Sequence, residues 1–203
     1  MRVSIFFNKK RIMLTWMFAI VLIIIILFSE SYWESIYILS DIFFFIGALL
    51  VGIATMGRLW CSVYISGYKT QSLIKIGPYS MCRNPLYFFS LLGAIGVGLA
   101  TESLVIPFVI FIFFLLYYPF VIQEEEKNLS KLHEKEFETY CKNTPKFIPS
   151  FSQLNEPEKS VIFPKIFRKN LFDALWFIWL FGIIEIVEAL HENRIIPIFF
   201  KRL

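Results

Sequence analysis

The chain has 203 residues, of which 57% are hydrophobic. Soluble domains are about 45–50% apolar, and the excess here is gathered into blocks, so an ordinary soluble globular domain is excluded. The formal net charge of +4 comes largely from basic residues at the ends of these blocks and gives no support to nucleic-acid binding.

Four apolar blocks predict membrane-spanning helices, because a spanning helix needs roughly 20 mainly apolar residues. In chain order they are residues 12–28, 36–57, 86–100 and 104–122. The first block is too long for the apolar core of a signal peptide and no small-residue cleavage site follows it, so it predicts an uncleaved span. The third block is short and predicts a tilted or partly interfacial helix.

Basic residues alternate between the two sides of the predicted spans, which predicts their orientation. The connection after the first span carries Glu30 and Glu34 and no basic residue. The N-terminal arm and the connection after the second span carry Lys9, Lys10, Arg11, Arg58, Lys69, Lys75 and Arg83. We therefore predict an integral, multi-pass membrane protein whose N-terminus and second connection lie in the cytoplasm, together with the lysine-rich segment after the fourth span.

Neither the histidines nor the cysteines predict a metal site. His133 and His191 are far apart, with no cysteine or carboxylate at zinc-ligand spacing. Cys61, Cys82 and Cys141 form no CxxC pair and fall on the predicted cytoplasmic side, where disulfides are rare. We expect the cysteines to be reduced, small core residues.

A polar cluster precedes the third block. Gly77 and Pro78 predict a turn, and Pro85 suits the first turn of the following helix. Arg83 is thereby held at the start of this helix, where its planar guanidinium suits a carboxylate or a phosphate. Arg83 equally fits a residue that reaches lipid headgroups, as basic residues at helix ends do. The cluster alone leaves both interpretations open.

Small residues within the blocks predict close helix packing. The run at 93–98 looks like a nucleotide-binding loop, but it lies in an apolar helix with no strand before it. Ala94 and Gly98 are four residues apart, as are Ala48 and Gly52. Such pairs let helices approach closely.

Residues 123–140 predict an amphipathic helix that leaves the membrane after the fourth span, because the apolar residues share one face. Glu124, Glu125 and Glu126 open this segment. They suit a helix start, where acidic residues favour the macrodipole, and they also suit a site for a cation beside the membrane. Pro145 follows the expected end of the helix.

The C-terminal segment 171–187 is apolar but contains Asp173 and Glu185. A fifth span would place the basic residues that follow it outside, against the charge distribution elsewhere. Those residues are His191, Arg194, Lys201 and Arg202. We predict a partly embedded packing helix, with Glu185 lining a substrate cavity as the alternative. The fold class is an all-α, polytopic membrane helical bundle with four spans and this C-terminal helix.

The two polar clusters together resemble the isoprenylcysteine carboxyl methyltransferase family, which is related in motif to the membrane phospholipid methyltransferases. The family combines a GxY turn, an Arg-His-Pro-x-Tyr, a helical hairpin, a Glu-Glu-x-x-Leu, an aromatic-Gly pair, two tyrosines three apart and a Pro-x-x-x-Pro. This chain supplies Gly77-Pro78-Tyr79, Arg83-Asn84-Pro85-Leu86-Tyr87, Gly96, Glu125-Glu126-Lys127-Asn128-Leu129, Phe137, Tyr140, Pro145 and Pro149. It departs at Asn84, where the family often has histidine, at Phe89, where glycine is common, and at His133-Glu134, which replaces the aromatic-Gly pair.

The resemblance implies S-adenosylmethionine as the cofactor, held on the cytoplasmic side where the two clusters meet, and a lipid-like or prenylated acceptor from the bilayer. The cofactor-binding residues it implies are Tyr79, Asn84, Pro85, Tyr87, Glu125, Glu126 and Tyr140. The catalytic residues it implies are Arg83 and Glu125. The two glutamates suit the amine or ribose hydroxyls of the cofactor, whereas Arg83 suits either the cofactor or an acceptor carboxylate.

The function predicted first is methyl transfer from S-adenosylmethionine to an acceptor carboxylate of the isoprenylcysteine type. A carboxylate is ionised at neutral pH and needs no strong base, which suits asparagine at residue 84. The alternatives are N-methylation of a phospholipid such as phosphatidylethanolamine, in which a Glu or Tyr takes a proton, and a catalytically silent membrane scaffold. We predict one domain over residues 1–203, with the motifs at about 58–150 and a linker and hydrophobic tail helix at 151–203.

Overall fold

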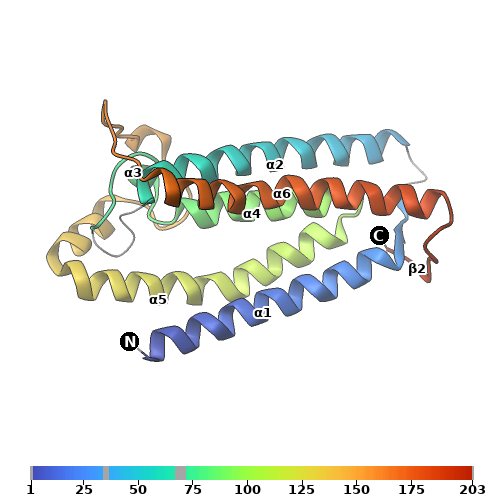
Figure 1. Cartoon of the computed structure of the whole chain (residues 1–203), viewed down its shortest axis with the longest axis horizontal. Coiled ribbons are helices and arrows are strands. Elements are labelled where there is room, and N and C mark those ends of the chain that lie inside the picture. The colour runs from blue at the N-terminus through green and yellow to red at the C-terminus, as the bar shows by residue number, and fades with distance from the viewer. Residues whose placement is uncertain (1, 34–36, 67–71, 203) are drawn as a thin grey trace.

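A computed structural model describes residues 2–33, 37–66 and 72–202 of the chain. This part is almost entirely helical, and the long helices run side by side along one axis (Figure 1). The elements are α1 Arg2–Leu27, β1 Ser29–Ser31, α2 Tyr37–Ile65, α3 Pro78–Met81, α4 Pro85–Leu99, α5 Val105–Asn143, η2 Phe151–Gln153, α6 Pro164–Glu192 and β2 Phe200–Arg202. Glu34 and Lys69, which entered the orientation argument, lie outside the described residues.

Three helices are long and apolar enough to cross a membrane, by length and composition: α2 from Ile38, α5 and α6. The segments Met13–Leu27 of α1 and Pro85–Leu99 of α4 are shorter apolar helices. The 15 residues of α4 extend about 22 Å, which is less than the ~30 Å hydrocarbon core of a bilayer. The third block therefore forms the short helix that its sequence predicts.

The C-terminal helix is longer than the predicted segment 171–187. α6 has 29 residues, packs against α2 and α4, and is long and apolar enough to span a membrane by length and composition. It runs from the end of the bundle that holds α3, called the site end, to the end that holds β1 and β2, called the far end (Figure 1). The two chain termini consequently lie at opposite ends of the bundle.

Contacts at the far end explain how the basic C-terminus is accommodated there. β1 pairs in parallel with β2, which brings Arg202 to the end of α1. Arg202 is buried, and its guanidinium donates to the carbonyl and hydroxyl oxygens of Ser29 at 3.0 and 2.8 Å and to the carbonyl oxygen of Thr101 at 3.0 Å. Lys201 forms an ion pair with Glu30 at 3.2 Å. The distribution of basic residues predicts orientation as if Lys201 and Arg202 were solvated cations. In the folded protein, both instead have partners within the chain.

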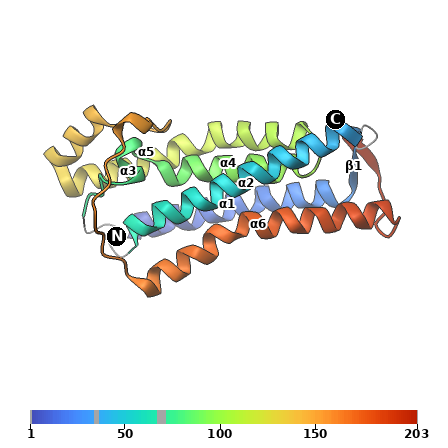
Figure 2. The ribbon, with the colours of Figure 1, turned by 90° about the horizontal axis from the view of Figure 1, so that it is seen from above.

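The remaining helices pack around this frame. Seen from above, α6 lies along one edge of the bundle and α5 along the other, with α2 and α4 between them (Figure 2). α1 is joined to α5 and α6 by a core cluster of buried side chains. Its members are Leu22, Ile26, Ile106 and Val187. Burial of such side chains is favourable in proportion to the apolar contact they make.

α2 and α4 approach each other most closely through glycines that the sequence did not single out as a pair. A Cβ added to Gly47 would lie 2.7 Å from the carbonyl oxygen of Gly96, and a Cβ on Gly96 would lie 2.7 Å from that of Gly47. The prediction of a contact at Gly52 is wrong, because a Cβ there meets nothing within 4 Å. Gly98 packs closely, but against Pro107 of α5.

α5 joins the predicted fourth span and the predicted amphipathic helix in one element that ends at Asn143. Within it, Glu134 has non-helical backbone angles, φ 32° and ψ −110°, and α5 changes direction at the site end (Figure 1). Glu134 stands where the family resembled in the sequence has glycine, the residue that adopts positive φ at the lowest cost. This chain therefore bends here without the residue that best tolerates positive φ.

Candidate active site

The turn before the third block is confirmed, and one glycine makes it possible. Gly77 has φ 60°, and a Cβ at this position would lie 2.4 Å from the ring of Tyr64. Pro78 and Pro85 begin α3 and α4, where a missing backbone N–H costs nothing. The residues between them are thereby fixed at the site end of the bundle.

Arg83 is joined to α5 and does not extend towards lipid headgroups. Its Nε donates to Oε1 of Glu126 at 2.9 Å, and its Nη1 donates to the carbonyl oxygens of Cys141 at 2.9 Å and Thr144 at 3.4 Å. The side chains of Arg83 and Glu126 are 13% and 17% exposed, so the ion pair is largely shielded from water. The guanidinium of Arg83 therefore pairs with a carboxylate of the protein itself.

Glu126 gathers further residues around this ion pair. Asn84 donates from Nδ2 to Oε1 of Glu126 at 3.2 Å and to the carbonyl oxygen of Lys146 at 2.9 Å. The ammonium of Lys146 lies 3.8 Å from Oε2 of Glu126. Sequence reasoning missed Lys146, because it lies outside the motif positions and becomes a neighbour only when the chain folds back after α5.

The three adjacent glutamates have separate surroundings. Glu124 is exposed, whereas Glu125 and Glu126 are half-buried. Glu125 accepts a hydrogen bond from the hydroxyl of Tyr87 on α4 at 2.7 Å, and the ring of Tyr87 meets that of Tyr118 edge-on at 5.3 Å. The structure thus brings the two predicted clusters together through two different carboxylates.

Two tyrosines of the predicted site lie beside this network. The hydroxyl of Tyr140 donates to the carbonyl oxygen of Tyr79 at 2.6 Å, which fixes α3 against α5. The hydroxyl of Tyr79 is itself buried and has no hydrogen-bond partner among the residues that the structure describes. Burial raises the pKa of Tyr79 well above the usual range, so the phenol remains protonated at neutral pH. A buried polar group without a partner calls for an explanation, and a ligand is one.

The segment that follows α5 closes over α3 from outside. The backbone N–H of Arg83 donates to the carbonyl oxygen of Pro145 at 2.8 Å, and that of Ser150 donates to the carbonyl oxygen of Met81 at 3.0 Å. The Pro-x-x-x-Pro motif therefore has a structural role here. It holds the chain in an extended path along the residues that carry Arg83.

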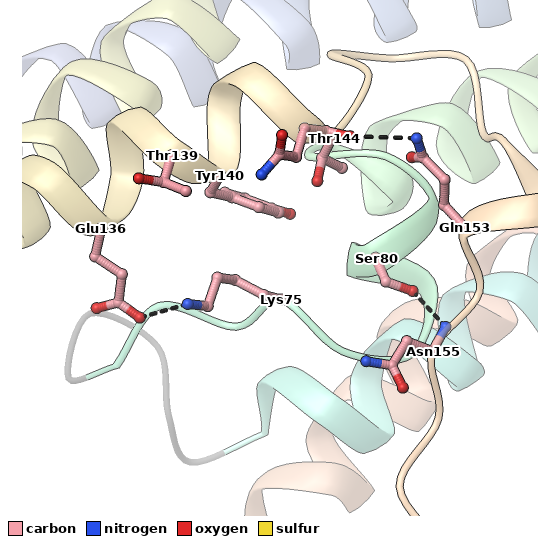
Figure 3. Close-up of a pocket in the computed structure, with 9 residues that line it drawn as sticks. Lys75, Ser80, Glu136, Thr139, Tyr140, Thr144, Gln153 and Asn155 are labelled. Atoms are coloured by element: carbon pink, nitrogen blue, oxygen red, sulfur yellow. Dashed lines mark hydrogen bonds and ion pairs between the residues drawn. The ribbon is translucent and has the colours of Figure 1, made fainter.

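A solvent-open pocket of about 570 Å³ lies next to the network (Figure 3). Its lining residues are Lys75, Ser80, Glu136, Thr139, Tyr140, Asn143, Thr144, Gln153 and Asn155. Lys75 and Glu136 form an ion pair of 2.6 Å on one side of it. Of the site residues predicted from the sequence, Tyr140 lines this pocket, and the sequence did not predict the pocket itself. Its lining is drawn from three separate segments whose meeting no local pattern signals.

Together these features define a helical membrane protein with a half-buried polar site at one end of the bundle, built from two distant motifs. Comparison with known families matches residues 36–136 to the phospholipid methyltransferases, and the chain belongs to this family of S-adenosylmethionine-dependent enzymes. The matched region runs from the start of α2 into the final part of α5 and contains the first motif and the Glu-Glu-x-x-Leu part of the second. The resemblance seen in the sequence is thereby confirmed for the family.

Two relatives match most of the chain. It is 37% identical over 171 residues to the cobalt-zinc-cadmium resistance protein CzcN of Cupriavidus metallidurans, covering 84% of this chain and 78% of that protein. It is 35% identical over 194 residues to the nickel-cobalt-cadmium resistance protein NccN of Alcaligenes xylosoxydans xylosoxydans, covering 96% of this chain and 90% of that protein. No solved structure matches the chain.

Proposed function

We propose that this protein transfers a methyl group from S-adenosylmethionine to a lipid-like acceptor, with a carboxylate of the isoprenylcysteine type as the first candidate. The observation that carries the proposal is the meeting of the two family motifs at the site end. Glu126 contacts Arg83 and Asn84, and Glu125 contacts Tyr87. Family membership supports the class of reaction, and these contacts support locating it at the site end.

The side chains suit the charges of the cofactor, which carries a sulfonium, an ammonium and a carboxylate. Glu125 offers a carboxylate held in place by Tyr87, and Tyr79 offers a buried hydroxyl that lacks a hydrogen-bond partner. We assign Glu125 to the cationic end of the cofactor and the hydroxyl of Tyr79 to its polar groups. When bound, S-adenosylmethionine supplies an electrophilic methyl group.

Other predicted site residues take positioning roles in this proposal. Arg83 is engaged by Glu126 and by two backbone carbonyls, so it fixes the start of α4 against α5. Asn84 braces the same carboxylate, and Pro85 begins the helix that carries Tyr87. Tyr140 holds α3 through the carbonyl of Tyr79. We therefore assign Arg83 a positioning role and not the catalytic role that the resemblance implies.

The site suits an acceptor that needs no strong base. A carboxylate is ionised at neutral pH, so the protein has only to align it and to exclude water. Asn84 cannot carry a proton near neutral pH, in contrast to the histidine that the family often has there. The shielded environment of Arg83 and Glu126 is consistent with exclusion of water.

A second candidate is N-methylation of a phospholipid, which the family description favours. An amine acceptor must lose a proton, and Glu125 is the carboxylate placed to accept it beside Tyr87. Incubation with radiolabelled S-adenosylmethionine and either S-farnesylcysteine or phosphatidylethanolamine separates the two candidates, because the label enters a base-labile ester or a stable amine.

We further propose that the reaction contributes to resistance against cobalt, zinc, cadmium or nickel, the trait for which both relatives are named. Deletion of the gene should then lower the metal concentration that stops growth. Complementation with Glu125→Gln tests the catalytically silent alternative. A scaffold would still restore resistance with this variant, whereas an enzyme would not.

Calorimetric titration with S-adenosylmethionine in mild detergent and in lipid nanodiscs tests the cofactor assignment. Glu125→Gln should weaken binding about tenfold or more, because a hydrogen bond to a charged group contributes about 1.5–3 kcal/mol. The exposed Glu124→Gln is the matched control and should leave binding unchanged. Absence of binding to the wild-type protein in both media would overturn the assignment.

A further inference from the structure

Arg58 lies inside α2, about two turns before the helix ends, although the sequence placed it in the connection after the second span. Its guanidinium is directed towards α4 and α6. Nη1 donates to the hydroxyl of Ser90, and Nη2 lies 3.4 Å from the carbonyl oxygen of Asp173. The group also stands 5.5 Å from the centre of the Phe177 ring. Arg58 is therefore a half-buried cation that faces α4 and α6.

The charge of Arg58 is incompletely matched by the protein. Its Nε is buried and has no hydrogen-bond acceptor within residues 2–33, 37–66 and 72–202. In the described part of the chain, the ion pairs include no carboxylate partner for Arg58, and Asp173 contacts it through its carbonyl oxygen. The carboxylate of Asp173 acts on it only at longer range. An ionisable side chain within a membrane helix is costly and usually marks a functional site.

Arg58 is also connected to the candidate active site. Ser90 follows Tyr87 by three residues on α4, so the two side chains share one face of that helix. Tyr118 of α5 packs edge-on against Tyr87. Arg58 thus lies about one helical turn deeper in the bundle than the contact between Tyr87 and Glu125.

We propose that Arg58 binds the anionic group of the methyl acceptor, a carboxylate or a phosphate. The inference rests on the proposed function, because that function requires an acceptor beside the cofactor. Both groups match the planar fork of a guanidinium, and the buried Nε supplies an unused donor. Arg83 is less suited to this role, because its own Nε already donates to Glu126.

The competing explanation is that Arg58 only ties α2 to α4 and α6 through Ser90 and Asp173. The two explanations differ in what the cation recognises. If Arg58 only ties the helices together, a variant without Arg58 should be less stable but should keep the ligand preference of the wild type. An acceptor site predicts that the preference for anionic over neutral amphiphiles disappears.

The test measures binding of matched amphiphiles to detergent-solubilised protein. S-farnesylcysteine is compared with its methyl ester, and phosphatidic acid with phosphatidylcholine, so that carboxylate and phosphate recognition are separated. Wild-type protein should bind at least one anionic member about tenfold more tightly than its partner, as expected for a charge-assisted hydrogen bond. Arg58→Gln should abolish the difference, and the exposed Arg168→Gln should preserve it. Equal binding by the wild type, or an intact preference in Arg58→Gln, would overturn the proposal.

If Arg58→Gln does not fold, Arg58→Lys carries the test, because it keeps a cation and loses the Nε donor. Its preference should persist with severalfold weaker affinity, and unchanged affinity would contradict the proposal. Binding of S-adenosylmethionine, measured in the same samples, distinguishes failure of the proposed methyl transfer from failure of the anion site at Arg58. If the Arg58→Gln variant binds neither the anionic amphiphile nor S-adenosylmethionine, Arg58 has a purely structural role. A wild-type protein with the anion preference but without cofactor binding would remove the proposed function and retain Arg58 as an anion site.

Discussion

Gly47 and Gly96 face each other across the contact between α2 and α4, each under the carbonyl oxygen of the other. An added Cβ would meet a backbone atom at 2.7 Å on either side, and backbone cannot rotate out of the way as a side chain can. This crossing sets how closely α4 lies against α2. It therefore also positions Tyr87 and Ser90 on α4 relative to Arg58.

Gly96→Ala is expected to destabilise the protein by about 1–3 kcal/mol, because the two helices must separate to admit the methyl group. Gly52→Ala is the matched control on α2, since a Cβ there meets nothing within 4 Å. Melting temperatures in one detergent measure both. Equal values for the two variants would show that the helices do not cross at Gly96.

Arg83→Ala is expected to lower stability by about 3 kcal/mol, because it leaves the largely buried carboxylate of Glu126 without its main partner. Lys75→Ala is the control, since it breaks the exposed pair with Glu136 and should change the melting temperature little. A comparable loss in both variants would mean that the pair of Arg83 and Glu126 is as hydrated as the surface pair.

Tyr79→Phe is expected to preserve or raise stability, by up to about 1 kcal/mol, because the hydroxyl it removes is buried without a partner. The same change should weaken S-adenosylmethionine binding if that hydroxyl meets the cofactor. Tyr140→Phe should instead lower stability, since its hydroxyl donates to Tyr79 at 2.6 Å. Thermal unfolding and calorimetry of both variants distinguish a ligand-binding hydroxyl from a structural one.

The raised pKa of Tyr79 also predicts a dependence of stability on pH. In the unfolded chain the phenol ionises near pH 10.0, whereas in the folded protein it ionises well above that value. The wild-type protein should therefore lose stability relative to Tyr79→Phe as pH rises above 10, while the difference stays constant below it. Unfolding curves between pH 8 and 11 measure the trend. A constant difference throughout would show that the phenol is not buried.

Glu134→Gly is expected to stabilise the protein by about 1 kcal/mol, because glycine adopts positive φ without the strain that a side chain imposes. Lys135→Gly, one residue further in helical conformation, should destabilise by about the same amount. If both variants lower the melting temperature equally, Glu134 is helical in solution.

Hydropathy and motif spacing predicted the frame of this molecule and the meeting of the two clusters. They misplaced Arg58, because the apolar block was ended at Gly57, just before this charge, whereas the helix α2 continues to Ile65. The charge is accommodated by Ser90 and Phe177, which belong to other helices and are invisible to local sequence reasoning. Lys146 escaped prediction for the same reason.

The sequence prediction also made α6 too short, because of charged residues within it and after it. Asp173 and Glu185 interrupt its apolar pattern, and the basic residues beyond it argued against a fifth span. The burial of Arg202 on the carbonyl of Thr101 depends on tertiary contacts between three segments. Composition alone treats such an arginine as if it were in water. Within α2 and α4, the small-residue pattern indicated close packing but could not specify which glycines face each other.

The pairing of β1 with β2 has a consequence for biosynthesis. β1 leaves the ribosome near the beginning of translation, but its partner strand is made only after every helix of the bundle. The far end of α1 therefore lacks its β2 contacts until translation has nearly finished. A nascent chain stopped before Phe200 would carry every residue of the site and still leave the acceptors on Ser29 and Thr101 without Arg202. The β1–β2 pairing and the contacts of Arg202 can thus form only after the whole bundle has been synthesised.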